Sequence, residues 1–146
     1  RRALDLGSNA TPLGGGSTSL TMKLTESLTD VNGFAFIINF DPSQLTPDMT
    51  AGDNGVQLSP GLSRASLITH LEPGRLSVGI TLKGDVIHGI ANLCTISFIP
   101  SDELQNGFLS DVLIDDTRGA RICRKPGGSP VFESVESNGG TVVIRK

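Results

Sequence analysis

The segment FAFIINF, at residues 34–40, alternates large apolar side chains with smaller or polar ones. Successive side chains of a β-strand point to opposite faces of the sheet, so a period of two separates this segment into two sets. The first set is Phe34, Phe36, Ile38 and Phe40, and the second set is Ala35, Ile37 and Asn39. Four bulky groups on one face predict a central strand that buries this face in a core.

Shorter segments on both sides of residues 34–40 repeat this alternation. Asp41-Pro42 ends the central strand, because proline cannot donate a ladder hydrogen bond, and Glu72-Pro73-Gly74 indicates the turn of a hairpin. No window of eleven residues carries a helical apolar stripe without Gly or Pro. The alternation therefore predicts an all-β protein, a sandwich of two antiparallel sheets with eight or nine strands. The expected strands are residues 20–25, 34–40, 66–71, 75–82, 89–99, 109–115, 131–135 and 141–144.

The overall composition describes one domain, residues 1–146, without a general attraction to polyanions. Of its residues, 37% are hydrophobic, and the net charge of −3 argues against nucleic acid and anionic membrane surfaces as partners. No apolar run of about 18 residues is present, so we expect no membrane insertion. Residues 1–6 are expected to be the cut end of an excised module, and residues 48–63 a long surface loop.

Residues suited to chemistry are scattered along the chain. His70 and His88 accompany no serine elbow, HExxH motif or phosphate-binding loop, so we expect no enzyme and no cofactor. Cys94 reads as a buried small hydrophobe, and a disulfide between Cys94 and Cys123 is left open. Six Phe without any Trp or Tyr provide few platforms for stacking sugars, so we expect no small-molecule ligand. A structural calcium ion stays an alternative to plain turn chemistry at two groups of oxygen ligands, Asp48 with Asp53 and Asn54, and Asp115 with Asp116.

The order of several short motifs resembles that of cohesin modules, the receptors on bacterial and archaeal scaffold proteins that bind dockerin modules. The likeness spans nearly the whole chain, and the motifs are moderately specific when taken together. They are VNGF (residues 31–34) leading into FDP (40–42) with Leu45, GRLSV (74–78), GIANLCTISF (89–98), SDVLID (110–115) and NGGTV (138–142).

The resemblance implies a nine-stranded jelly-roll sandwich that does no chemistry and holds a calcium-loaded helical dockerin on one sheet face. It also implies an extracellular or cell-surface location, as a module of a larger secreted protein. In the family, the binding face is formed by strands that look like residues 34–40, 66–71, 75–82 and 109–115. The family-like register turns Leu71 outward, whereas apolarity alone turns it inward. The predicted partner-binding residues are Ala35, Ile37, Asn39, Leu71, Ser77, Gly79, Thr81, Asp111 and Leu113.

Other interpretations of the same residues stay open. Outward Ile37 and Leu113 suit a protein partner, since burying each contributes about 1.5–3 kcal/mol, but isolated apolar side chains are also ordinary on protein surfaces. The basic segment that follows Asp116 is either a solvated hairpin or a patch that steers an acidic partner. It contains Arg118, Arg121, Arg124 and Lys125. The competing functional classes are a carbohydrate-binding module and a structural spacer or adhesin domain.

Overall fold

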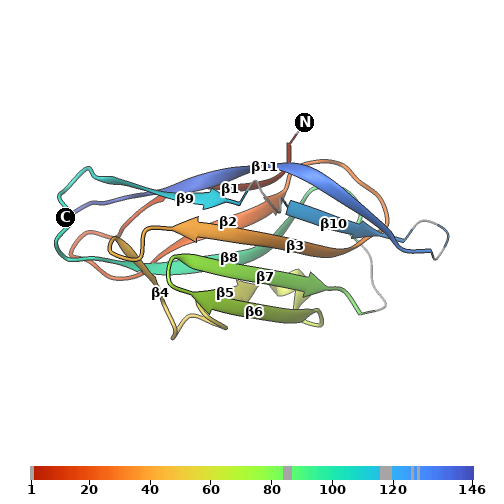
Figure 1. The fold of residues 1–146 in the computed structure, drawn as a ribbon, viewed down its shortest axis with the longest axis horizontal. Helices are drawn as coiled ribbons and strands as arrows, with labels where there is room; N and C mark the ends of the chain where they lie inside the picture. Colours follow the sequence, from red (N-terminus) through yellow and green to blue (C-terminus); the bar gives the residue numbers. More distant parts are fainter. Residues whose placement is uncertain (1, 84–86, 116–119, 126, 128) are drawn as a thin grey trace.

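The computed structural model describes residues 2–83, 87–115, 120–125, 127 and 129–146, and it is built almost entirely of strands (Figure 1). A short helical element, the 3-10 turn η1 (Pro60–Leu62), interrupts the strands. The strands are β1 (Arg2–Ala10), β2 (Thr18–Leu24), β3 (Val31–Phe40), β4 (Leu45–Pro47), β5 (Val56–Leu58), β6 (Ser66–Glu72), β7 (Arg75–Thr81), β8 (Ala91–Pro100), β9 (Leu109–Ile114), β10 (Ala120–Arg124) and β11 (Val131–Val143). None of the described residues belongs to a helix that could cross a membrane.

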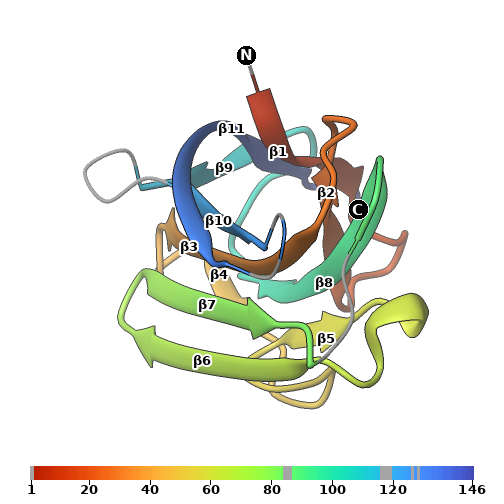
Figure 2. The same ribbon diagram turned by 90° about the vertical axis from the view of Figure 1, so that its right-hand side faces the viewer.

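The strands form one continuous sheet that rolls into two layers around a core, as the end-on view shows (Figure 2). Along the sheet, the order is β4-β8-β2-β1-β11-β10-β3-β7-β6, while β5 also pairs with β8. Strand β9 lies between β11 and β3, beyond the end of β10. Every pairing of these strands is antiparallel except that of β1 with β11, which is parallel.

The core contains the inward set that the period of two predicts for residues 34–40. Phe34, Phe36, Ile38 and Phe40 are all buried. The ring of Phe40 meets that of Phe98 edge-to-face, with the ring centroids 5.3 Å apart. Leu76 and the other alternate residues of β7 are buried as well, so the predicted core face is confirmed.

The all-β class is confirmed, but the expected nine antiparallel strands are eleven, with one parallel pair. The additional strands are β1, β4, β5 and β10, which are short or carry too little apolar alternation to be recognised. In addition, β11 is one strand of 13 residues where two strands and a turn at Gly139-Gly140 were expected. A Cβ atom at Gly140 would overlap the carbonyl of Gly7, so these glycines permit close approach of neighbouring strands rather than a turn.

Residues 48–63 are more ordered than the expected loop, because they include β5 and η1. Asn54 adopts a left-handed backbone conformation with φ of 50°, and its side-chain Nδ2 donates to Thr69 Oγ1 over 2.9 Å. Thr69 lies in β6, the last strand of the sheet, whereas Asn54 lies two residues before β5 begins. This hydrogen bond therefore ties the free edge of the sheet to the segment before β5.

We expect Asn54→Ala to lower the free energy of unfolding by about 2 kcal/mol. The substitution removes the hydrogen bond to Thr69 and leaves a Cβ-bearing residue without local polar support at positive φ. Asn54→Gly loses the same hydrogen bond but relieves the backbone, so we expect it to cost only about 1 kcal/mol. Urea unfolding monitored by circular dichroism measures both values, and wild-type stability of Asn54→Ala would contradict this role of Asn54.

Candidate functional site

The outward positions of β9, β3, β7 and β6 form one continuous sheet surface, which we call the outer face. The register of the pairs fixes how its residues meet. Ala35 of β3 lies opposite Gly79 of β7, and Ile37 lies opposite Ser77. Asn39 pairs with Leu113 of β9 on the other side of β3. The four strands that the family resemblance selected are therefore neighbours in space (Figure 1).

The predicted partner-binding residues occupy the outer face with one exception. Ala35, Thr81, Asp111 and Leu113 are exposed. The others on the outer face are half-buried, namely Ile37, Asn39, Ser77 and Gly79. Their role in binding stays a prediction, because their position in the fold does not by itself show contact with a partner.

Leu71 is the exception, and the structure corrects its expected outward orientation. It is half-buried and packs against the hydrophobic core, as does Leu67, which lies four residues earlier in β6 and on the same face. The outward residues of β6 are instead Ile68 and His70, both exposed. Burial of the two leucines sets the register of β6, so the apolar pattern is a better guide here than the register taken from the family.

The centre of the outer face is hollowed, because its floor carries almost no side-chain volume. Ala35 contributes one methyl group to the floor and Gly79 contributes none. The hollow has a volume of about 340 Å³. The residues around its floor are Ile37, Ile68, Thr69, His70, Ser77 and Arg121. Sequence reasoning missed Ile68 and His70, although the inward phase of Leu67 and Leu71 contains the signal that places them outward.

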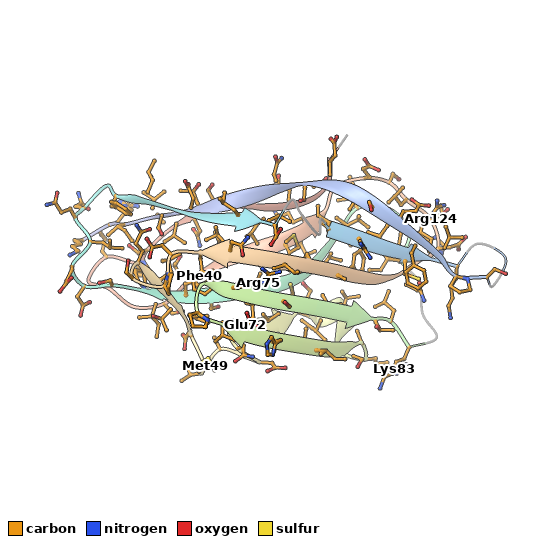
Figure 3. The ribbon with its side chains drawn as sticks, in the orientation of Figure 1. Phe40, Met49, Glu72, Arg75, Lys83 and Arg124 are labelled. Atoms are coloured by element: carbon orange, nitrogen blue, oxygen red, sulfur yellow. The ribbon has the colours of Figure 1, made fainter. Side chains whose placement is uncertain are left out.

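Two polar contacts lie near the hollow. The charge of Arg75 is compensated by Asp115, with Arg75 Nη2 3.6 Å from Asp115 Oδ2, and His70 Nε2 lies within hydrogen-bond distance of Glu72 Oε1, at 3.2 Å. Figure 3 shows Arg75 and Glu72 near the same end of the β6–β7 hairpin, whereas Arg124 lies toward the other end of the molecule. Arg121 also lines the hollow, and it has no hydrogen-bond or ion-pair partner among the described residues.

The basic segment does not form one uniform patch. Arg124 is engaged on two sides: its Nε donates to the carbonyl of Thr29, and its Nη1 lies 3.2 Å from Glu133 Oε1. Lys125 is exposed, and Arg118 falls outside the described residues. Of this segment, Arg121 is the described residue that reaches the outer face.

The residues considered as metal ligands or catalytic groups do not form a cluster among the residues that the structure describes. No group of three or more His, Cys, Asp or Glu that could hold a metal ion occurs in the described part of the chain. The carboxylate of Asp48 accepts hydrogen bonds from the hydroxyl and the backbone N–H of Thr50. The bond from the Thr50 hydroxyl, then one from the Ser17 side chain and then the backbone bond, hold the pKa of Asp48 below its ordinary value. Asp116, from the second oxygen-ligand group, lies outside the described residues.

The surroundings of His88 and of the two cysteines indicate structural roles and not catalytic ones. The Nδ1 atom of His88 accepts the backbone N–H of Asp30 over 3.4 Å. Both cysteines are free thiols, so the disulfide that was left open is not formed. Burial raises the pKa of the Cys94 thiol to about 12, in agreement with its expected role as a small buried hydrophobe.

Comparisons with solved structures identify the class of fold. A non-cellulosomal cohesin from the archaeon Archaeoglobus fulgidus is 17% identical, with a TM-score of 0.74 over 100% of this chain and 92% of that chain. The sixth cohesin of scaffoldin B from Acetivibrio cellulolyticus, solved in complex with a Cel5 dockerin mutant, is 15% identical, with a TM-score of 0.75 over 99% of both chains. A cohesin module from a Clostridium perfringens family 33 glycoside hydrolase is 11% identical, with a TM-score of 0.74 over 99% and 98%.

The chain therefore has the cohesin fold, a jelly-roll β-sandwich. No family model matches the sequence, and no curated protein matches it either. At identities of 11–17%, these similarities establish the fold, while the chemistry of the outer face depends on this chain's own residues.

Proposed function

We propose that this domain is a non-catalytic interaction module that binds a calcium-loaded dockerin through its outer face. The observation that carries the proposal is the outer face itself: a sheet surface with exposed apolar side chains around a floor of small residues. Ile68 is 72% exposed and Leu113 is 56% exposed, although both occupy regular strands. Such groups on a rigid surface are typical of the centre of a protein interface.

The energetics of the outer face fit an interface of ordinary size. Burying Ile37, Ile68 and Leu113 contributes up to about 1.5–3 kcal/mol for each side chain, within a standard interface of about 800 Å² per partner. The strands hold these groups in place before binding, so little conformational entropy is lost on association. Ile37 and Ile68 line the hollow, whereas Leu113 lies beside Asn39 on β9, so a helical dockerin has to extend from the hollow onto β9 to bury all three side chains.

We also propose that the domain acts outside the cell, where it assembles complexes as one module of a larger secreted protein. The cohesin of scaffoldin B that has a similar fold supports a role in such an assembly by analogy of fold alone.

The phenylalanines argue against the competing function, a carbohydrate-binding module. Phe132 is 75% exposed and Phe108 is 36% exposed, whereas the other four are buried. Leu109, next to Phe108, pairs with Val143, which is eleven residues further along β11 than Phe132. At about 3.3 Å per residue, the two exposed rings lie about 36 Å apart, too far for one sugar-stacking platform.

Calorimetric titration of the purified domain with calcium-loaded dockerins encoded in the same genome tests the proposal. We expect binding of at least one dockerin, and loss of the heat signal after EDTA removes the calcium from the dockerin. An oligosaccharide titration serves as the parallel experiment for the carbohydrate alternative. Lack of heat with every dockerin of that genome would overturn the proposed function.

We expect Gly79→Val to weaken this binding by about tenfold or more without harming the fold. A Cβ atom at position 79 meets nothing closer than the Ile68 carbonyl at 3.9 Å, and valine favours strands, so the domain accepts the change. The new side chain fills the floor of the hollow and prevents close approach of a partner. Thr21→Val, in β2 of the other layer, is the control that should leave affinity unchanged. If Gly79→Val binds with wild-type affinity, the partner does not contact the floor of the hollow.

A further inference from the structure

Arg121 lies in a row of residues that crosses the outer face. In β10 it pairs with Ala35 of β3 on one side and with Ser134 of β11 on the other. Ala35 pairs with Gly79, and Gly79 pairs with Ile68. Arg121 and Ile68 are therefore opposite walls of the hollow, with the two smallest side chains between them.

The positive charge of Arg121 is uncompensated within the described part of the chain. The other arginines near it are neutralised locally, Arg75 by Asp115 and Arg124 by Glu133. Arg121, in contrast, is exposed and forms no hydrogen bond or ion pair with any described residue. Its guanidinium can therefore form a bidentate pair with a carboxylate from outside the chain.

The width of the hollow indicates what kind of element carries that carboxylate. Three strand spacings separate Arg121 from Ile68, which amounts to about 14 Å between their Cα atoms. An α-helix with its side chains is about 10–12 Å wide. A single helix can thus lie over Ala35 and Gly79, with its apolar side toward Ile68 and a neighbouring residue facing Arg121.

We propose that Arg121 is a specificity-determining residue that selects a partner helix bearing an Asp or Glu at the β10 side of the hollow. The recognition surface thereby extends beyond the four strands of the outer face onto β10. This inference rests on the proposed function, since the helix belongs to the dockerin. The guanidinium supplies charge recognition, while its aliphatic stem forms one wall of the hollow.

Titration of a dockerin that binds the wild-type domain, against variants of Arg121, tests the inference. Because Arg121 is exposed, its replacement leaves the core untouched, and circular dichroism verifies folding. We expect Arg121→Glu to weaken binding by about 30-fold or more, since it places like charges in contact. Arg121→Lys keeps the charge but loses the planar fork, and we expect a loss of about three- to tenfold. Arg145→Glu, at the opposite end of the molecule near the C-terminus, is the charge-matched control (Figure 1).

Charge-reversal variants of the dockerin identify the acidic group that pairs with Arg121. Each exposed Asp or Glu of its helices that is not a calcium ligand is replaced by Arg, and one such variant should regain affinity for Arg121→Glu while losing affinity for the wild type. Equal binding of Arg121→Glu and the wild type, alongside lost binding of Ile37→Asp, would overturn the role of Arg121 and leave the proposed function standing. Absence of binding by the wild-type domain would overturn both.

Discussion

Replacing Ile37 with aspartate is expected to weaken dockerin binding by at least about 100-fold while the domain stays folded. Ile37 lies in the middle strand of the outer face, opposite Ser77, and it lines the hollow. A carboxylate at this position would be removed from water on binding. Arg75 is already paired with Asp115, and in the proposed complex Arg121, the other cation beside the hollow, is paired with the acidic group of the dockerin. The half-buried side chain is not part of the core, so folding tolerates the change.

The matched control for this variant is Ile99→Asp. Ile99 is an isoleucine that is 47% exposed in β8, which lies in the other layer. Calorimetric titration of both variants, with a thermal melt of each, separates loss of the interface from loss of the fold. If Ile37→Asp binds as tightly as Ile99→Asp, the interface is not on the outer face.

We expect Gly140→Ala to lower the free energy of unfolding by about 3 kcal/mol or more. Gly140 pairs with Gly7 in the parallel contact between β1 and β11, and a methyl group there would overlap the Gly7 carbonyl. The backbone of β1 has to move to accept the methyl group, and such overpacking costs about 1–3 kcal/mol even where flexible side chains give way. A loss of this size is a large part of the stability of a small domain, which is about 5–15 kcal/mol.

Gly61→Ala provides the comparison for Gly140→Ala. A Cβ atom at Gly61 meets no atom within 4 Å, and its φ is not in the left-handed region. We expect its stability to stay within about 0.5 kcal/mol of the wild type, as for other surface substitutions. Urea unfolding of the two variants measures the difference. Equal stability would contradict the close approach of β1 to β11.

The predicted features that the structure confirms depend on local alternation. The period of two in residues 34–40 placed Phe36 in the core and Ile37 on the opposite face, and the same reasoning placed Leu76 and Ser77 in β7. This succeeds because the side-chain direction in a strand is a property of the backbone itself. In β6, the predicted orientation of Leu71 was wrong because the register of the family was preferred to the apolar pattern, which turns Leu71 toward the core.

The missed features depend on partners that are distant in the chain. β1 and β10 carry weak apolar patterns, so what makes them strands is a neighbour with free hydrogen-bonding groups, β11 in both cases. Gly139-Gly140 has the composition of a turn, yet it is extended because two other strands approach it closely. Such pairings are set by the packing of the whole sheet, and no short stretch of sequence contains them.

For this protein, the residues alone thus determined the all-β class and the core face of each main strand. Tertiary packing decided the rest of the candidate site. It joined β9, β3, β7 and β6 into one surface, brought Arg121 beside Ala35, and turned Ala35 and Gly79 into the floor of a hollow. The physical reason is that side-chain alternation is local, whereas the order of strands in a sheet follows from which long-range pairings bury the most apolar surface and satisfy the backbone hydrogen bonds.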